Sequence, residues 1–189
     1  MGTCSNFILI EEEKLRQYFE KQIQYDLQKA LEQRQWHEII YYDNETPIGK
    51  NNGFTEIPPG TYNKDLSRTL SMVLHETSDL FSLKKYECGY WLSPQEIPRW
   101  LNFMFALCKR FYEHAFDEVL WKYYDLQVSE EEQAMIEAYF DWQQSIPVEP
   151  NTQHAEVFVQ LSCRLADFRQ IQKQFNAGKV DFLLFYLSY

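Results

Sequence analysis

Both ends of this chain are strongly apolar, and this feature constrains the fold more than any other. Residues 5–10 read SNFILI, and residues 180–189 read VDFLLFYLSY. Short apolar runs rich in β-branched and aromatic residues are typical of buried strands. A chain end this apolar would invite aggregation if its strand stayed unpaired. We therefore expect the two terminal strands to share one sheet, with the carboxyl-terminal strand beside residues 7–10.

The sequence between these strands is mainly helical in its pattern. Apolar residues that recur every three or four positions predict five helices. Their expected ranges are 11 to 34–36, 66–83, 93–124, 129–144 and 152–177, and further strands are expected at 37–42 and 86–92. The sequence therefore predicts an α+β fold, in which a small mixed sheet that includes both terminal strands is packed with about five helices.

Two of the predicted helices have clear amino-terminal signals. Ser93 is followed by Pro94 and then by Glu96, and Ser129 is followed by Glu132. This spacing is that of the capping box, in which the serine and glutamate side chains each bind a backbone N–H at the start of a helix. Pro98 lies one turn beyond Ser93, so we expect it to distort that turn.

The chain length fits one domain. At 189 residues with 45% hydrophobic content, the chain is large enough for an independent core. Residues 43–65 hold three of the six glycines and three of the seven prolines, which predicts a long irregular loop. A loop of this length is either functional or a surface excursion. We predict a single domain over residues 1–189 and keep both interpretations of this loop.

The order of elements resembles that of the YfbM-like bacterial family, whose function is unknown. The similarity rests on Met1-Gly2 running directly into a strand, and on the Pro58-Pro59-Gly60 loop. It rests also on the strand-into-helix text GYWLSPQEI at 89–97, and on Phe168 followed by FNAG at 175–178 before the last strand. The resemblance implies an α+β fold and carries no known activity.

The net charge of the chain is confined to one stretch. Residues 111–163 contain eleven acidic residues and a single basic residue, Lys122. The remainder has seventeen acidic and seventeen basic residues, so this stretch supplies the whole net charge of −10. Ten aromatic residues lie in the same stretch. A concentrated acidic field with large rings beside it attracts and holds a basic partner.

We therefore predict that this stretch presents an acidic, aromatic face to a basic protein partner, as in an immunity-type or adaptor-like inhibitory protein. The predicted contact residues are Glu113, Asp117, Glu130, Glu137 and Asp141, with Trp121 and Tyr124 as aromatic contacts. The alternative interpretation is a solvated outer surface, in which the acids at 130–132 serve only to favour the helix dipole.

The composition also disfavours several classes of partner. Nucleic acids and anionic lipids are bound by clustered lysine and arginine, which an acidic chain lacks. The amino terminus has no basic segment of a secretory signal, and no apolar run approaches the length of a membrane span. The four cysteines form no close pair. We expect a cytoplasmic protein with free thiols that binds neither nucleic acid nor membrane.

Sequence motifs for catalysis or cofactor binding are absent. The chain has no G-x-S-x-G, no phosphate-binding glycine loop and no H-E-x-x-H. His75 and His114 have carboxylates nearby, but a metal site needs a third converging ligand. We therefore expect no metal and no cofactor, and we favour a binding protein over an enzyme. The alternatives are an enzyme or small-ligand binder with its site under the 43–65 loop, and a structural subunit of an assembly.

Overall fold

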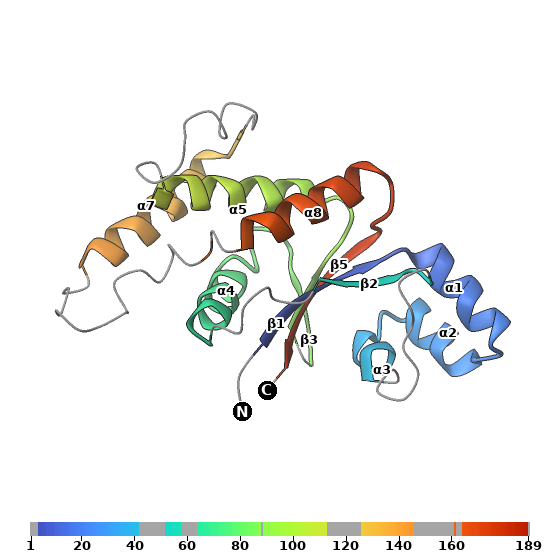
Figure 1. The fold of residues 1–189 in the computed structure, drawn as a ribbon. Helices are drawn as coiled ribbons and strands as arrows, with labels where there is room; N and C mark the ends of the chain where they lie inside the picture. The colour runs from blue at the N-terminus through green and yellow to red at the C-terminus, as the bar shows by residue number, and fades with distance from the viewer. Residues whose placement is uncertain are drawn as a thin grey trace.

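A five-stranded antiparallel sheet forms the centre of the computed structural model (Figure 1). The structure describes residues 4–41, 52–57, 64–87, 89–112, 126–145, 161 and 164–188. The strands are β1 (Cys4–Ile10), β2 (Phe54–Ile57), β3 (Lys84–Tyr86), β4 (Gly89–Leu92) and β5 (Phe182–Ser188). Their order across the sheet is β2-β1-β5-β4-β3.

The two terminal strands are neighbours near the middle of this sheet. β1 pairs antiparallel with β5 along its whole length, with Phe7 opposite Phe185 and Ile10 opposite Phe182. The rings of Phe7 and Phe185 meet edge to face, 5.4 Å between centroids. The fold class is therefore α+β with both terminal strands in one sheet, as the sequence predicts, although the pairings in the described residues are all antiparallel and the sheet is not mixed.

The described residues form seven helices around the sheet. They are α1 (Glu12–Lys21), α2 (Tyr25–Glu32), α3 (Trp36–Tyr41), α4 (Lys64–Glu76), α5 (Ile97–Tyr112), α7 (Glu130–Ser145) and α8 (Leu165–Asn176). Figure 1 shows α4, α5, α7 and α8 gathered on one side, and α1, α2 and α3 at the opposite end of the molecule.

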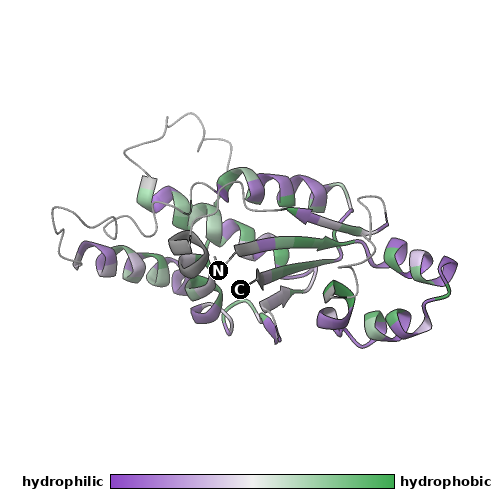
Figure 2. Ribbon diagram, turned by 60° about the horizontal axis from the view of Figure 1, so that its bottom comes forward, coloured by the Kyte–Doolittle hydropathy of each residue, from purple (hydrophilic) through white to green (hydrophobic). Residues whose placement is uncertain are grey.

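Alternate side chains of β1 enter two different cores. Phe7 and Leu9 pack in the larger core with α4, α5, α7 and α8. Ile8 and Ile10 pack in a smaller core with α1, α2 and α3. Because both faces of the sheet are covered, the strand is apolar at every position from 7 to 10 rather than at alternate ones. Figure 2 shows the hydrophobic colouring of the central strands.

The predicted helix over 11 to 34–36 is two helices. The chain leaves the helical conformation at Ile23, whose φ is 57°. The Ile23 N–H binds the carbonyl of Glu20 at 3.1 Å, and the Gln24 N–H binds that of Phe19 at 2.9 Å. This pattern is a Schellman motif, which ends a helix with one left-handed residue. Periodicity alone missed the break because the apolar spacing continues across it.

The strand predicted at 37–42 is wrong, because Trp36–Tyr41 is helix α3. Its β-branched and aromatic residues favour a strand locally. The burial pattern is nevertheless helical, since Trp36 and Ile39 are fully buried and Ile40 packs against the same core. Tertiary packing has overridden local preference here. The strand predicted at 86–92 is a hairpin made of β3 and β4.

The region predicted to be an irregular loop contains an ordered strand. β2 occupies residues 54–57 and pairs with β1, with Ile57 opposite Phe7. Gly53 precedes it with a φ of 93°, and a Cβ there would lie 2.5 Å from the backbone nitrogen of Leu15. A glycine therefore allows the chain to approach α1 closely. Residues 43–51 and 58–63 of the predicted loop lie outside the described residues.

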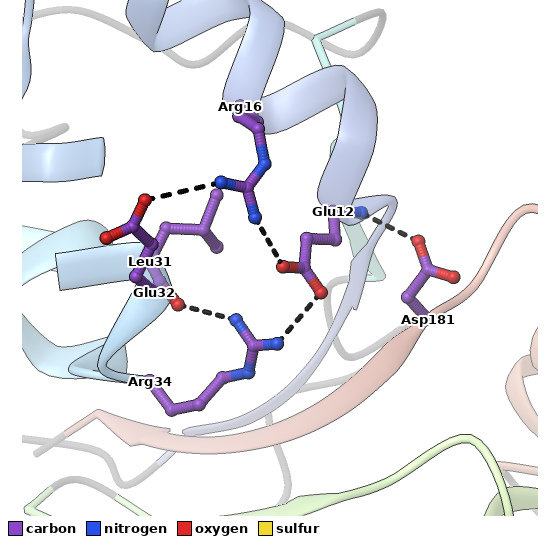
Figure 3. Close-up of polar contacts among 6 residues, drawn as sticks. All are labelled: Glu12, Arg16, Leu31, Glu32, Arg34 and Asp181. Carbon is purple, nitrogen blue, oxygen red and sulfur yellow. Dashed lines mark hydrogen bonds and ion pairs between the residues drawn. The ribbon is translucent and has the colours of Figure 1, made fainter. Parts of the chain in front are cut away.

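A network of ion pairs fastens α1 to α2 (Figure 3). The Glu12 carboxylate accepts a hydrogen bond from Arg16 at 2.9 Å and another from Arg34 at 2.9 Å. Arg16 also contacts Glu32 at 3.4 Å. The Glu12 backbone N–H donates to the Asp181 carboxylate at 2.7 Å, which ties the start of α1 to the strand side of the molecule. Charge-assisted bonds of this kind fix the relative positions of the two helices.

Candidate functional site

Helix α7 carries the acidic residues of the predicted binding face that the structure describes, and a capping box fixes its start. The Glu132 N–H donates to the Ser129 Oγ at 3.2 Å, and the Ser129 N–H donates to the Glu132 Oε2 at 2.8 Å. Both halves of the predicted capping box are therefore confirmed. At Ser93 the helix begins later than predicted, at Ile97, so Pro98 lies in the first turn where its missing N–H is not needed.

The second oxygen of Glu132 is used to attach α7 to α5. Arg99 donates from its Nε to Glu132 Oε1 at 2.5 Å, and from its Nη1 to the carbonyl of Leu80 at 2.9 Å. The Glu132 side chain is only 2% exposed. A carboxylate buried this deeply needs a charged partner, which Arg99 supplies. Glu132 is thus a structural residue and does not contribute a free negative charge to the surface.

Glu137, one of the predicted contact residues, is also paired internally. The Arg110 guanidinium lies 3.0 Å from both of its carboxylate oxygens. The same guanidinium stacks over the ring of Phe140, 3.5 Å from its centroid. The charge count over residues 111–163 indicated that these acids lack basic neighbours. The neutralising arginines come from α5, which precedes that stretch in the chain but packs against α7 in space.

The outer surface of α7 retains acidic residues of its own. Glu130 and Asp141, two of the predicted contacts, are exposed, and so is Glu131. None of the three forms an ion pair within the described part of the chain. Their spacing places them away from Ile136 and Tyr139, which are buried. The remaining predicted contacts, Glu113, Asp117, Trp121 and Tyr124, lie outside the described residues and stay predictions.

An exposed aromatic residue that the sequence analysis did not single out lies on the same helix. Trp142 is 46% exposed and directly follows Asp141. It shares one face of α7 with Glu131, about three turns earlier, and the exposed Ala134 and Ala138 lie on the same face between them. The signal in the sequence was a tryptophan out of phase with the buried positions 132, 136, 139 and 143.

We define the α7 outer face as Glu130, Glu131, Ala134, Ala138, Asp141 and Trp142. Glu130 and Glu131 lie in the first turn, where acidic residues favour the helix dipole. Asp141 lies near the carboxyl end, where the dipole disfavours an acid, and the last turn contains no base. Helix stability therefore accounts for the first two acids but not for Asp141.

In the described residues, the candidate histidine–carboxylate pair is His75 with Glu76. Each of these two residues interacts with a tyrosine. The His75 Nδ1 lies 3.0 Å from the Tyr90 hydroxyl. Burial, together with the neighbouring Glu76, raises the pKa of Tyr139 well above its ordinary value. Within the described ranges, no group of three or more His, Cys, Asp or Glu residues is arranged to hold a metal ion. His114 lies outside those ranges.

The alternative site under the 43–65 loop has one edge, at Asn52, among the described residues. A hollow of about 270 Å³ lies beside Asn52 and is lined by Lys14, Tyr18 and Lys21. Lys14 is paired with Glu11 at 2.6 Å. The described lining of this hollow offers cationic, amide and phenol groups, without a carboxylate.

Two further buried groups, Cys108 and Arg164, have pKa values that burial shifts. Cys108 is a free thiol at the core of α5, and burial raises its pKa strongly, so the reactive thiolate is suppressed. Arg164 is 1% exposed, contacts Asp167 at 2.7 Å and lies over the ring of Phe7. Burial lowers the pKa of Arg164 and raises that of Asp167. The surroundings of Cys108 and of Arg164 are therefore those of residues packed in the core.

Comparison with family models, with curated proteins and with solved structures finds no significant match to this chain. The resemblance to the YfbM-like family therefore stays a prediction. The described helices include none that is long and apolar enough to cross a membrane.

Proposed function

We propose that this protein binds a basic protein partner through the α7 outer face, as an inhibitory or adaptor-like protein. The observation that carries the proposal is the adjacent pair Asp141 and Trp142. The tryptophan is 46% exposed, and the aspartate lies about one turn before the carboxyl end of the helix, where an acid does not favour the dipole. Tryptophan at the centre of a contact and acidic residues around it fit a surface that holds lysine or arginine side chains.

The charge of the whole chain supports the same class of partner. A net charge of −10 attracts basic proteins over distances beyond direct contact and repels nucleic acid and anionic surfaces. Because Glu132 and Glu137 are neutralised by arginines of α5, the attraction at α7 must come from Glu130, Glu131 and Asp141. The proposal thus rests on fewer acids than the sequence suggested, and each of them is exposed.

The proposal is tested by capture of partners from the source lysate at low and moderate salt, with identification by mass spectrometry. We expect a stoichiometric basic protein whose recovery falls as salt rises. Glu131→Lys/Asp141→Lys should remove it, and Trp142→Ser should weaken its binding by about tenfold or more. Glu137 is left unchanged in this design because its reversal would break the pair with Arg110.

The matched controls lie at the other end of the molecule. Glu13→Lys/Glu20→Lys makes the same change in net charge on the exposed surface of α1, and Tyr25→Ser removes an exposed aromatic residue there. Both controls should retain the partner. Equal loss in test and control variants would show that only the overall charge matters, and undiminished capture by the test variants would overturn the proposal.

A further inference from the structure

We draw no further inference here: the strongest candidate, the buried Arg164 side chain at the start of α8, carries nothing, because its guanidinium already pairs with Asp167 and nothing in the described residues shows a ligand beside it.

Discussion

Ile23 shows how a single residue can work against the stability of its own fold. The left-handed conformation costs an L-residue about 1–2 kcal/mol, whereas glycine adopts it freely. Glycine in turn gives up about 0.5–1 kcal/mol through the greater freedom of the unfolded chain. Ile23→Gly should therefore raise the free energy of unfolding by about 0.5–1 kcal/mol, as measured by urea denaturation.

Gly178 allows the opposite substitution, from glycine to a residue with a side chain, at a position with the same left-handed conformation. Its φ is 68°, and a Cβ there would meet nothing within 4 Å, so Gly178→Ala tests the backbone conformation without a steric clash. We expect this variant to lose about 1 kcal/mol. A loss of stability in Ile23→Gly would show that the isoleucine side chain stabilises the folded chain.

Arg164 and Asp167 form an ion pair whose burial is costly. Burial lowers the pKa of the arginine and raises that of the aspartate, which means that the charged form of each is disfavoured in the folded chain. Asp167→Leu should destabilise the protein by about 3–5 kcal/mol, because it leaves a buried arginine without its partner. Arg164→Met/Asp167→Leu should recover most of that loss, since apolar pairs of similar volume replace such ion pairs well.

Thermal or urea unfolding of the two variants distinguishes this account from simple packing. If the double variant were less stable than Asp167→Leu alone, the guanidinium would be stabilising through its contact with Phe7 and not through the ion pair.

At the scale of the helix, α7 is positioned by its first turn. Ser129→Ala should cost about 1 kcal/mol, the usual value of an amino-terminal cap. Glu132→Ala should cost more, because it removes both the second half of the capping box and the acceptor of Arg99. Glu131→Ala is the matched control, since Glu131 is exposed, and should stay within about 0.5 kcal/mol of the natural sequence. Equal free energies of unfolding for Glu131→Ala and Glu132→Ala would contradict this account of α7.

The elements that could be predicted from sequence are those with signals in adjacent residues. The capping box at Ser129 and the apolar terminal strands belong to this class, because a few neighbouring side chains determine them. The break at Ile23 carries no glycine to mark it, and Trp36–Tyr41 has strand-forming residues in a helix. In both places the packing of α1, α2 and α3 against the sheet decides the structure, and such contacts come from residues distant in sequence.

The candidate site shows the same limit. Charge counting located the acidic stretch, but it could not show that Arg110 would reach Glu137 or that Arg99 would reach Glu132. Those partners are close only once α5 and α7 pack together. The sequence analysis also overlooked Trp142. This residue is exposed because another side of α7 packs against the core.

At the scale of the whole molecule, one sheet separates two cores. The larger core supports α7, and the smaller core supports the α1–α2 turn. The strand pair β1 and β5 contributes to both cores, so the two ends of the molecule share one support. This arrangement accounts for terminal segments that are apolar on both faces.

The most direct test of the binding account is the rate at which the captured basic partner associates with this protein as ionic strength is varied. Electrostatic attraction by Glu130, Glu131 and Asp141 predicts an association rate that falls steeply with salt, and a shallow dependence in Glu131→Lys/Asp141→Lys. The Glu13→Lys/Glu20→Lys control should keep most of the salt dependence. An association rate that does not change with salt, or that responds equally in both variants, would contradict a role for the α7 outer face.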